Sequence, residues 1–372
     1  MAGHVLVTGG AGFIGSHTVD ALIADGSRVR VLDVLDPRVH PLGRPSYLTE
    51  EAEFIHGDAA DREVLLGALE GIDEVVHLAA HQDYMPDFSS FMHVNAESAA
   101  LLFELIVANR LPVGRILFAS SQSVAGEGLY RCASHGSLVP DPRPVAQLDR
   151  RDWDLHCPQC GQYMEPMLIK EEICHPHTVY GISKYAVELI AGNLGPRYGI
   201  TTICMRYTYV QGTRNSFFNA YSGICRRMAL QISNGIAPCC YEDGRQLRDF
   251  VNVADVAAAN LAALRRSPDG HAVYNVGGGT AVTPLDFANE MLSAWGSPLQ
   301  PQIPGIYRMG DTRHTVSDTS AISALGWRPT IPFEQTIREY RDWFATFEGT
   351  QQYLAAADRA MEEQAVLRRA GG

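Results

Sequence analysis

The sequence predicts an α/β fold built on a doubly wound parallel sheet, and three observations support it. The chain has 372 residues, which suits one large α/β unit with a smaller attached lobe. Hydrophobic residues make up 46% of the chain, enough for a sizeable core. In the first third, short apolar strands alternate with helices. Such alternation is typical of parallel strands that are covered by helices on both faces.

The individual elements follow from this alternation. Strands are predicted at 4–8, 28–33, 53–56, 74–78, 115–120 and 201–207. Helices are predicted at 13–25, 61–69, 92–109 and 180–193. The pattern is interrupted between Glu127 and His177, where the chain is rich in Pro, Cys, His and charged residues. A loop of this length in a compact domain requires something else to order it.

A glycine-rich run joins the first strand to the first helix, and it reads Thr8-Gly9-Gly10-Ala11-Gly12-Phe13-Ile14-Gly15. Gly9 permits a tight turn, Gly12 lets a pyrophosphate approach the helix N-terminus, and Gly15 lets the helix pack closely on the strand. Glycines also serve ordinary turns. Because this run lies between a strand and a helix, it predicts a Rossmann-type dinucleotide site with Phe13 and Ile14 beside the cofactor.

Asp33 ends the second strand, where a carboxylate can accept hydrogen bonds from both hydroxyls of an adenosine ribose. No Arg or Lys directly follows it to bind a 2′-phosphate, so NAD is favoured over NADP. The alternative is that Asp33 only caps the strand. Other residues expected around the cofactor are Asp58, Ala59, Leu78, Ala79, Ala80 and Asn95. For Asn95, tying down a neighbouring loop is an equally good interpretation.

Tyr180 and Lys184 are four residues apart on a predicted helix and therefore share one face. A free tyrosine has a pKa near ~10, and a nearby ammonium lowers it, which makes the phenol a usable base. Lys184 can also hold the nicotinamide ribose. The alternative is an ordinary surface pair, which the upstream dinucleotide motif disfavours.

A serine-rich segment ends the fifth strand, where open α/β folds bind their ligands. Ser121 is predicted to bond the reacting substrate oxygen, with Ser123 as the alternative and Gln122 nearby. Ser120 is expected to face the core.

These motifs resemble the extended short-chain dehydrogenase/reductase family, in particular its nucleotide-sugar epimerases and dehydratases. The resemblance runs from about residue 4 to about residue 345, apart from the interruption. Later segments that carry it are 206–212, 248–256, 274–279 and 308–311. It implies that Arg248 and Arg308 clamp the diphosphate of a sugar nucleotide, as arginine forks suit phosphate oxygens.

A finer similarity points to the dTDP-L-rhamnose 4-epimerase branch of that family. It is carried by the two Cys-containing motifs of the interruption, by 219–223 and by 242–244. It implies that Asn219 contacts the sugar or its phosphates. The sequence departs from the family near the expected sugar pocket, where Tyr209 replaces Asn, Gln211 replaces Tyr and Ala125 replaces Tyr. The resemblance therefore implies the reaction type more than the sugar.

The implied activity is a nucleotide-sugar 4-epimerase that oxidises C4 transiently with bound NAD, turns the keto sugar over and returns the hydride. The substrate would be a dTDP-, UDP- or GDP-sugar, and the family suggests a homodimer. The first alternative is a 4,6-dehydratase or oxidoreductase. A dehydratase needs an acid beside the catalytic hydroxyl, and Gln122 and Ser123 stand there instead. The second alternative is a non-catalytic NAD-binding sensor, which has no need of Tyr180 and Lys184.

The interruption contains two short motifs, each closed by glycine: Cys132-x-x-His135-Gly136 and Cys157-x-x-Cys160-Gly161. Paired loops of this kind provide the four N and S ligands of a structural zinc site in a ribbon-like insertion. Cys174 is the rival fourth ligand. The alternative is a set of free thiols in a flexible loop.

The sequence thus divides into three parts. Residues 1–207 are expected to form the NAD-binding domain, with the zinc-binding insertion at 127–177. Residues 208–349 are expected to form mainly a substrate lobe, with about 248–277 returning to the sheet. Residues 350–372 are expected to form an amphipathic helical tail.

The formal net charge is −12, which disfavours nucleic acid as a partner. The insertion itself has five Lys/Arg against eight Asp/Glu, so it does not favour nucleic acid either. No signal peptide and no uninterrupted membrane-spanning stretch is visible, so no membrane is expected and a cytoplasmic location is predicted. Eight cysteines are then expected as thiols or metal ligands.

Overall fold

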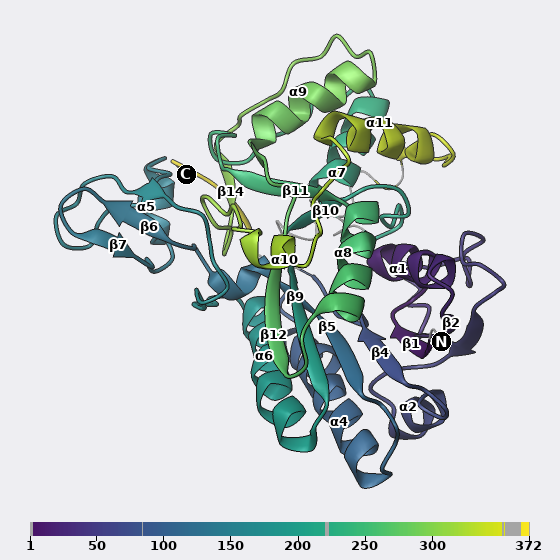
Figure 1. Cartoon of the computed structure of the whole chain (residues 1–372). Coiled ribbons are helices and arrows are strands. Elements are labelled where there is room, and N and C mark those ends of the chain that lie inside the picture. The colour runs from purple at the N-terminus through teal and green to yellow at the C-terminus, as the bar shows by residue number, and fades with distance from the viewer. Residues whose placement is uncertain (1–2, 84, 220–222, 352, 354–365, 372) are drawn as a thin grey trace.

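A seven-stranded parallel sheet forms the centre of the computed structural model (Figure 1), which describes residues 3–83, 85–219, 223–351, 353 and 366–371. Its strand order is β12-β9-β5-β4-β1-β2-β3, and every neighbouring pair is parallel. The strands are β1 (His4–Thr8), β2 (Arg28–Asp33), β3 (Glu53–His56), β4 (Glu74–His77), β5 (Arg115–Ser121), β9 (Thr201–Tyr207) and β12 (His271–Val276). The predicted doubly wound α/β fold is confirmed.

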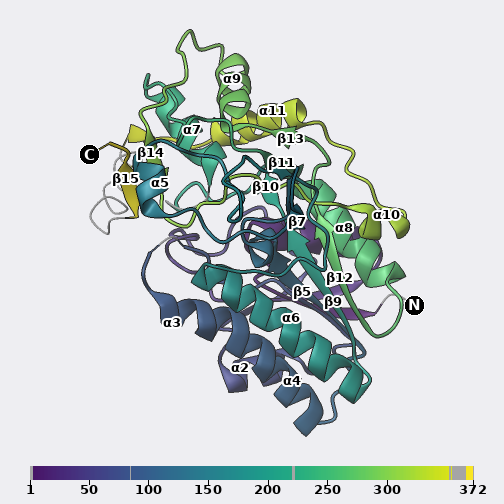
Figure 2. The ribbon, with the colours of Figure 1, turned by 90° about the vertical axis from the view of Figure 1, so that its left-hand side faces the viewer.

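Helices cover both faces of this sheet (Figure 2). One face packs against α1 (Phe13–Ala24) and α8 (Val253–Arg266), and the other packs against α2 (Arg62–Ala68), α4 (Ser98–Ala108) and α6 (Val179–Tyr198). In β1, Val5 and Val7 belong to the first core and Leu6 to the second. Because side chains alternate along a strand, a run of consecutive apolar residues supplies both cores.

The helix predicted at 92–109 is longer and less regular than expected. It consists of α3 (Phe88–Phe91), a π-helical segment η1 (Met92–Glu97) and α4. By length and composition Phe88–Ala108 is apolar enough to cross a membrane, which corrects the expectation that no such stretch exists. Half of this segment is buried inside the protein, as in the core helix of a doubly wound sheet.

The smaller lobe is built around a three-stranded sheet of β10 (Tyr209–Gln211), β11 (Arg248–Asn252) and β13 (Ala281–Val282). It also contains α7 (Ile224–Ser233), α9 (Pro284–Ala294) and α11 (Phe333–Phe344), which bury an apolar cluster around Phe287. Of the segment expected to return to the central sheet, β12 joins that sheet and α8 covers it, whereas β11 pairs within the lobe. The short α10 (Ser320–Ala324) lies near β12.

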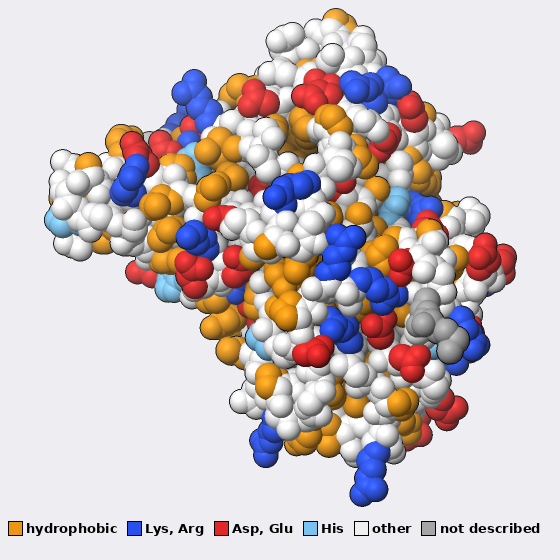
Figure 3. All heavy atoms as spheres, viewed as in Figure 1, with side chains coloured by type: hydrophobic (Ala, Val, Ile, Leu, Met, Phe, Trp, Pro, Cys, Tyr) orange, Lys and Arg blue, Asp and Glu red, His pale blue; other side chains and the backbone are white. Residues whose placement is uncertain are grey.

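The insertion begins after a 3₁₀ turn, η2 (Gln122–Ala125), and projects from the body (Figures 1 and 3). It holds a small antiparallel sheet with the strand order β7 (Gly136–Leu138), β6 (Tyr130–Cys132) and β8 (Glu165–Pro166). The helix α5 (Val145–Asp149) lies between β7 and β8 in the chain. Positive and negative side chains are interspersed over the visible face of the molecule (Figure 3).

The predicted helical tail is described only in part: residues 351 and 353 are helical, whereas residues 367–369 are not. Residues 352, 354–365 and 372 lie outside the described part of the chain. The last described residues form a strand, β15 (Leu367–Arg369), which pairs antiparallel with β14 (Ile306–Arg308). Pairing with β14 satisfies the backbone N–H and C=O groups of Leu367–Arg369, so these three residues form a strand where a helix was predicted.

Candidate active site

The glycine-rich turn at the end of β1 has the geometry that a dinucleotide requires. Gly9 has φ +69°, and a Cβ there would lie 2.8 Å from the backbone nitrogen of Ala79. A Cβ on Gly15 would overlap the carbonyl oxygen of Gly9. A Cβ on Gly12, the N-cap of α1, meets only that carbonyl oxygen, at 3.2 Å. Gly9 and Gly15 are therefore required by packing, whereas Gly12 leaves open space at the helix N-terminus where an anionic pyrophosphate fits.

Asp33 sits at the end of β2 and is buried beside this turn. Its carboxylate accepts hydrogen bonds from the backbone N–H groups of Ala11 and Leu35, both at 2.9 Å. The side chain thus fixes the glycine-rich turn, and its remaining lone pairs suit the ribose hydroxyls. Phe13 and Ile14 open α1 at this point.

The end of β4 lies beside β1 at the same C-terminal edge of the sheet. Burial lowers the pKa of His77 to about 3, so its ring is neutral and bonds Thr8 and Ser98 at 2.9 and 3.0 Å. Of the residues that follow, Leu78 and Ala79 are partly exposed and Ala80 is exposed. Asp58 and Ala59 follow β3, and the Asp58 carboxylate accepts the N–H of Ala60 at 2.8 Å.

Asn95 lies in η1 and is almost fully buried. Its side-chain oxygen accepts the N–H of His81 at 2.8 Å, and its amide donates to the His81 carbonyl and the Ser183 hydroxyl at 3.1 and 2.9 Å. These bonds join the loop after β4 to α6. The contacts of Asn95 therefore indicate that it holds the neighbouring loop in place.

Tyr180 and Lys184 lie in the first turns of α6, which Thr178 caps by accepting the N–H of Gly181 at 3.1 Å. Lys184 is buried and donates to the carbonyl oxygen of Ala119 on β5 at 3.0 Å. Its Nζ lies 6.0 Å from the centre of the half-buried Tyr180 ring. Burial lowers the pKa of Lys184 to about 8, so most of it carries a charge at neutral pH. A fixed ammonium at this place stabilises a phenolate.

The serines at the end of β5 lie against the start of α6. A Cβ on Gly181 would lie 2.6 Å from the carbonyl oxygen of Ser123. The hydroxyl oxygens of Ser121 and Ser123 are 2.5 Å apart in a hydrogen bond. Ser120 points the other way, as predicted, and donates to buried Glu188 at 2.5 Å. Gln122 is buried, and its side-chain oxygen has no hydrogen-bond partner among the described residues.

Glu188 is a supporting residue that the sequence analysis missed. It lies one turn beyond Lys184 on α6 and pairs with Arg206 of β9 through two bonds of 2.7 Å. Arg206 also donates to the carbonyls of Glu171 and Ile173, at 2.9 and 3.2 Å, in the segment that leads from the insertion to α6. The spacing of Tyr180, Lys184 and Glu188 at four-residue intervals was the available signal.

The residues expected to bind substrate lie in the lobe. Arg248 is buried, stacks over the Tyr209 ring at 5.2 Å and donates to the carbonyls of Thr312 and Arg313 at 2.7 and 2.9 Å. Arg308 bonds the carboxylate of Asp311 at 2.9 and 2.8 Å. The backbone N–H of Asn219 donates to Ser216 at 3.1 Å, and the next three residues lie outside the described chain.

The four predicted metal ligands converge in the insertion. The ligand atoms of Cys132, His135, Cys157 and Cys160 all lie within 4.8 Å of one another. Three of their distances are 3.4, 3.6 and 3.7 Å, which suits four ligands around one tetrahedral ion. The rival ligand Cys174 is outside this group, because its sulfur accepts a bond from Arg206 at 3.0 Å.

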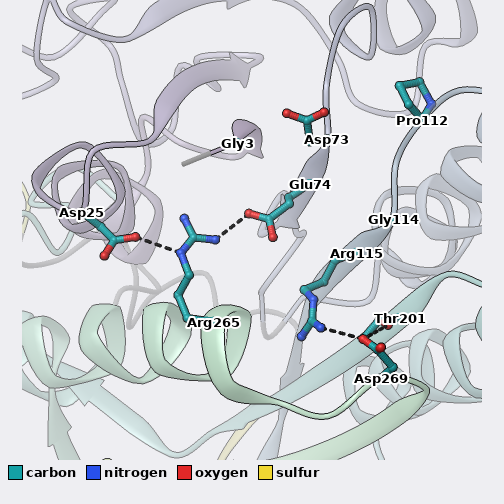
Figure 4. Close-up of a pocket in the computed structure, with 10 residues that line it drawn as sticks. All are labelled: Gly3, Asp25, Asp73, Glu74, Pro112, Gly114, Arg115, Thr201, Arg265 and Asp269. Carbon is teal, nitrogen blue, oxygen red and sulfur yellow. Dashed lines mark hydrogen bonds and ion pairs between the residues drawn. The ribbon is translucent and has the colours of Figure 1, made fainter. Parts of the chain in front are cut away.

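A cavity of about 730 Å³ lies at the opposite edge of the sheet (Figure 4). Its Arg265 pairs with Asp25 and Glu74 at 2.8 and 2.6 Å, and its Arg115 pairs with Asp269 at 2.9 Å. These charges neutralise one another within the protein. The cavity also lies at the N-terminal ends of the strands, whereas open α/β sheets bind ligands at the C-terminal ends. It is therefore not the active site.

Comparison with known proteins agrees with this geometry. The model of the NAD dependent epimerase/dehydratase family matches residues 5–143 and 158–277. The chain is 34% identical over 352 residues to dTDP-L-rhamnose 4-epimerase of Burkholderia thailandensis, covering 92% of this chain and 94% of that protein. UDP-glucose 4-epimerase of Thermotoga maritima with UDP-glucose has a TM-score of 0.73 at 26% identity, covering 92% of this chain and 99% of that one. The Thermus thermophilus UDP-glucose 4-epimerase complex with NAD has a TM-score of 0.71 at 27% identity, with the same coverage.

The matched residues include the glycine-rich turn, the serines of β5 and the Tyr180–Lys184 pair, and the gap in the match falls inside the insertion. The chain belongs to the NAD-dependent epimerase/dehydratase family.

Proposed function

We propose that the protein is a nucleotide-sugar 4-epimerase that uses bound NAD. The observation that carries this proposal is the convergence of the glycine-rich turn, the Ser121–Ser123 hydroxyls and the Tyr180–Lys184 pair at the C-terminal edge of one sheet. Relatives with the same core are named as 4-epimerases of dTDP-L-rhamnose and UDP-glucose. The residues present fit NAD, because Gly12 leaves the helix N-terminus open and Asp33 is at the ribose position.

Each residue has a defined task in this reaction. Tyr180 removes the proton from the C4 hydroxyl while Ser121 holds that oxygen, and Ser123 supports Ser121 through their shared hydrogen bond. Lys184 supplies the positive charge that stabilises the Tyr180 phenolate. Its hydrogen bond to the Ala119 carbonyl holds the ammonium group in place. NAD held by the glycine-rich turn and Asp33 would supply the hydride acceptor for C4 and, once reduced, the hydride donor, so the net reaction would be redox-neutral. Tyr180 returns the proton when the inverted alcohol forms.

The dehydratase alternative is less well supported. Eliminating water from C5 and C6 needs a carboxylic acid beside the catalytic hydroxyl. Gln122 and Ser123 occupy those positions, and neither can donate a proton as an acid.

Incubation with dTDP-, UDP- and GDP-sugars tests the proposal. We expect inversion at C4 of at least one of them, detected by NMR of the product. The reaction should need no added NAD and should consume none. No inversion by protein with bound NAD would contradict the epimerase assignment.

We also propose a structural zinc ion bound by Cys132, His135, Cys157 and Cys160. The four ligand atoms cluster in a part of the insertion whose apolar core is small: its buried members are Tyr130, Leu155, Met164 and the two ligands Cys132 and Cys157. Closed four-ligand sites are structural, since no position remains for a substrate. The eight cysteines are all free of disulfides, which supports a reducing, cytoplasmic location.

Replacing Cys157 with alanine is expected to remove the metal. Elemental analysis should find about one zinc per chain in the wild type and almost none in the variant, with a lower Tm because zinc binding stabilises the insertion. Cys174→Ala is the matched control and should retain zinc. Retention of zinc by the Cys157 variant, or its absence from the wild type, would contradict the site.

We further propose that the protein is a homodimer formed through α3, η1 and α6. Four large apolar side chains on these helices are solvent-exposed: Phe88 (57%), Met92 (40%), Ile182 (46%) and Leu189 (56%). They flank a shallow depression that contains Ala96, Ala100 and Ala186. An apolar face of this kind on two adjacent helices is typical of a self-complementary interface.

Ile182→Glu combined with Leu189→Glu is expected to convert the dimer to a monomer, because two charges would be buried without partners. Light scattering after gel filtration measures the mass. Leu42→Glu, at an 86% exposed loop position, is the control and should remain dimeric. A monomeric wild type would refute this interface.

A further inference from the structure

The base of the insertion is joined to the substrate lobe by a network of buried charges. The insertion contributes Glu127 and Arg143, and the lobe contributes Glu242 and Arg313. The exposed fractions of these side chains are only 1%, 1%, 2% and 2%. Charges buried this deeply are tolerated only when each has partners with good geometry. The contacts of the two arginines show what the network holds.

Arg143 connects three separate segments with one guanidinium. Its two terminal nitrogens form a bidentate pair with Glu242 at 2.9 and 3.0 Å. One of them also donates to the carbonyl of Trp153 at 2.8 Å, and the other to the carbonyl of Asp311 at 2.8 Å. The planar fork therefore joins the insertion backbone, a lobe carboxylate and the segment after β14.

Arg313 holds the same segment from its other end. Its side chain bonds Asp243 twice, at 2.7 and 2.8 Å, and bonds Asp154 of the insertion at 2.7 Å. Its backbone N–H donates to Glu127 at 2.7 Å. The chain from Asp311 to Arg313 is thus fastened to the insertion through backbone and side chains.

Both arginines expected to bind the diphosphate depend on this segment. Arg308 is bonded to the carboxylate of Asp311, whose carbonyl Arg143 holds. Arg248 donates to the carbonyls of Thr312 and Arg313. A shift of residues 311–313 would therefore move both guanidinium groups together.

We propose that Arg143 is a positioning residue for sugar-nucleotide binding, acting through residues 311–313 on Arg308 and Arg248. This inference rests on the proposed function, since it takes the ligand to be a nucleoside diphosphate derivative. The insertion is then part of the substrate site although it projects from the body (Figure 1). The insertion contributes by holding residues 311–313, which in turn fix the directions of the Arg308 and Arg248 side chains.

Arg143→Lys tests this, because lysine keeps the charge but cannot form the four-way fork. Calorimetry with dTDP, UDP and GDP identifies a nucleotide that the wild type binds. We expect the Kd of the variant for that nucleotide, and its KM for the sugar nucleotide, to rise about tenfold to 100-fold, as small misplacements of binding groups cost this much. The kcat should change less than the KM, and the amount of NAD that copurifies should not change.

Arg131→Lys is the matched control, because Arg131 is an exposed arginine of the same insertion whose one ion pair among the described residues is with Glu165. It should bind nucleotide like the wild type. Glu242→Gln disrupts the Arg143–Glu242 ion pair from the lobe side. It provides a second variant if Arg143→Lys does not fold. Unchanged nucleotide affinity in a folded variant of either kind overturns the proposal, as does failure of both variants to fold. A wild type that binds none of the three nucleotides refutes the proposed substrate class instead.

Discussion

Replacing Tyr180 with phenylalanine is expected to lower kcat by about 10²- to 10⁴-fold, the usual contribution of a positioned acid–base group. Phenylalanine keeps the ring that contacts Phe91, at 6.2 Å between centroids, so the fold should persist. The change removes only the hydroxyl group that we propose exchanges a proton with the C4 oxygen. Inversion at C4 followed by NMR measures the loss, and absorbance of the extracted cofactor measures bound NAD.

Tyr185→Phe is the control for this experiment, since it makes the same change one residue beyond Lys184 on α6. We expect near-normal turnover from it. Wild-type turnover by Tyr180→Phe with NAD bound would contradict the assigned role, and loss of NAD from that variant would indicate a binding role instead.

Replacing Arg206 with methionine is expected to reduce the free energy of unfolding by about 3–5 kcal/mol, because Glu188 then remains buried without an opposite charge, with only the Ser120 hydroxyl still bonded to it. The exposed fractions of the two side chains are 2% for Arg206 and 5% for Glu188, so water cannot compensate. The change also removes the bonds to Glu171 and Ile173 that fasten the approach to α6. Urea unfolding followed by circular dichroism measures the shift of the midpoint.

A double variant, Glu188→Leu with Arg206→Met, should be more stable than Arg206→Met alone, since no unpaired charge stays buried. Arg62→Met is the surface control, because Arg62 and Glu104 are 51% and 58% exposed and such pairs contribute about 1 kcal/mol or less. Glu188→Leu alone completes the comparison. If the losses of unfolding free energy of the two single variants add up to that of the double variant, the pair does not act as a buried unit.

The elements that the sequence predicted well are those whose signal is local. The strands of the central sheet are short apolar runs, and the ends of β1, β2, β3 and β9 agree with the predicted ones. The helix that carries Tyr180 continues five residues further than predicted, to Tyr198, although Pro196 lies near its end. Proline lacks the N–H donor of a helical hydrogen bond and its ring crowds the preceding turn, but Pro196 stands in the last turn, which the left-handed Gly199 closes.

Other features depend on contacts between distant residues and had no local signal. β11 reads like a strand of the main sheet but pairs with β10 and β13, and β15 pairs with β14 about sixty residues earlier. The two lobe partners of Arg143, Glu242 and Asp311, lie 99 and 168 residues away. A single sequence identifies a charged side chain but not which opposite charge is buried against it.

The sequence by itself determined the individual strands of the central sheet, the dinucleotide turn, the Tyr180–Lys184 spacing and the two Cys-containing motifs, because each depends on residues close together in the chain. Only the tertiary structure decided that Cys174 contacts Arg206, that Asn95 holds a loop, and that the insertion is bonded to residues 311–313 of the lobe. The physical reason is that buried polar groups must find partners wherever the fold brings them, and those partners lie far away in the sequence.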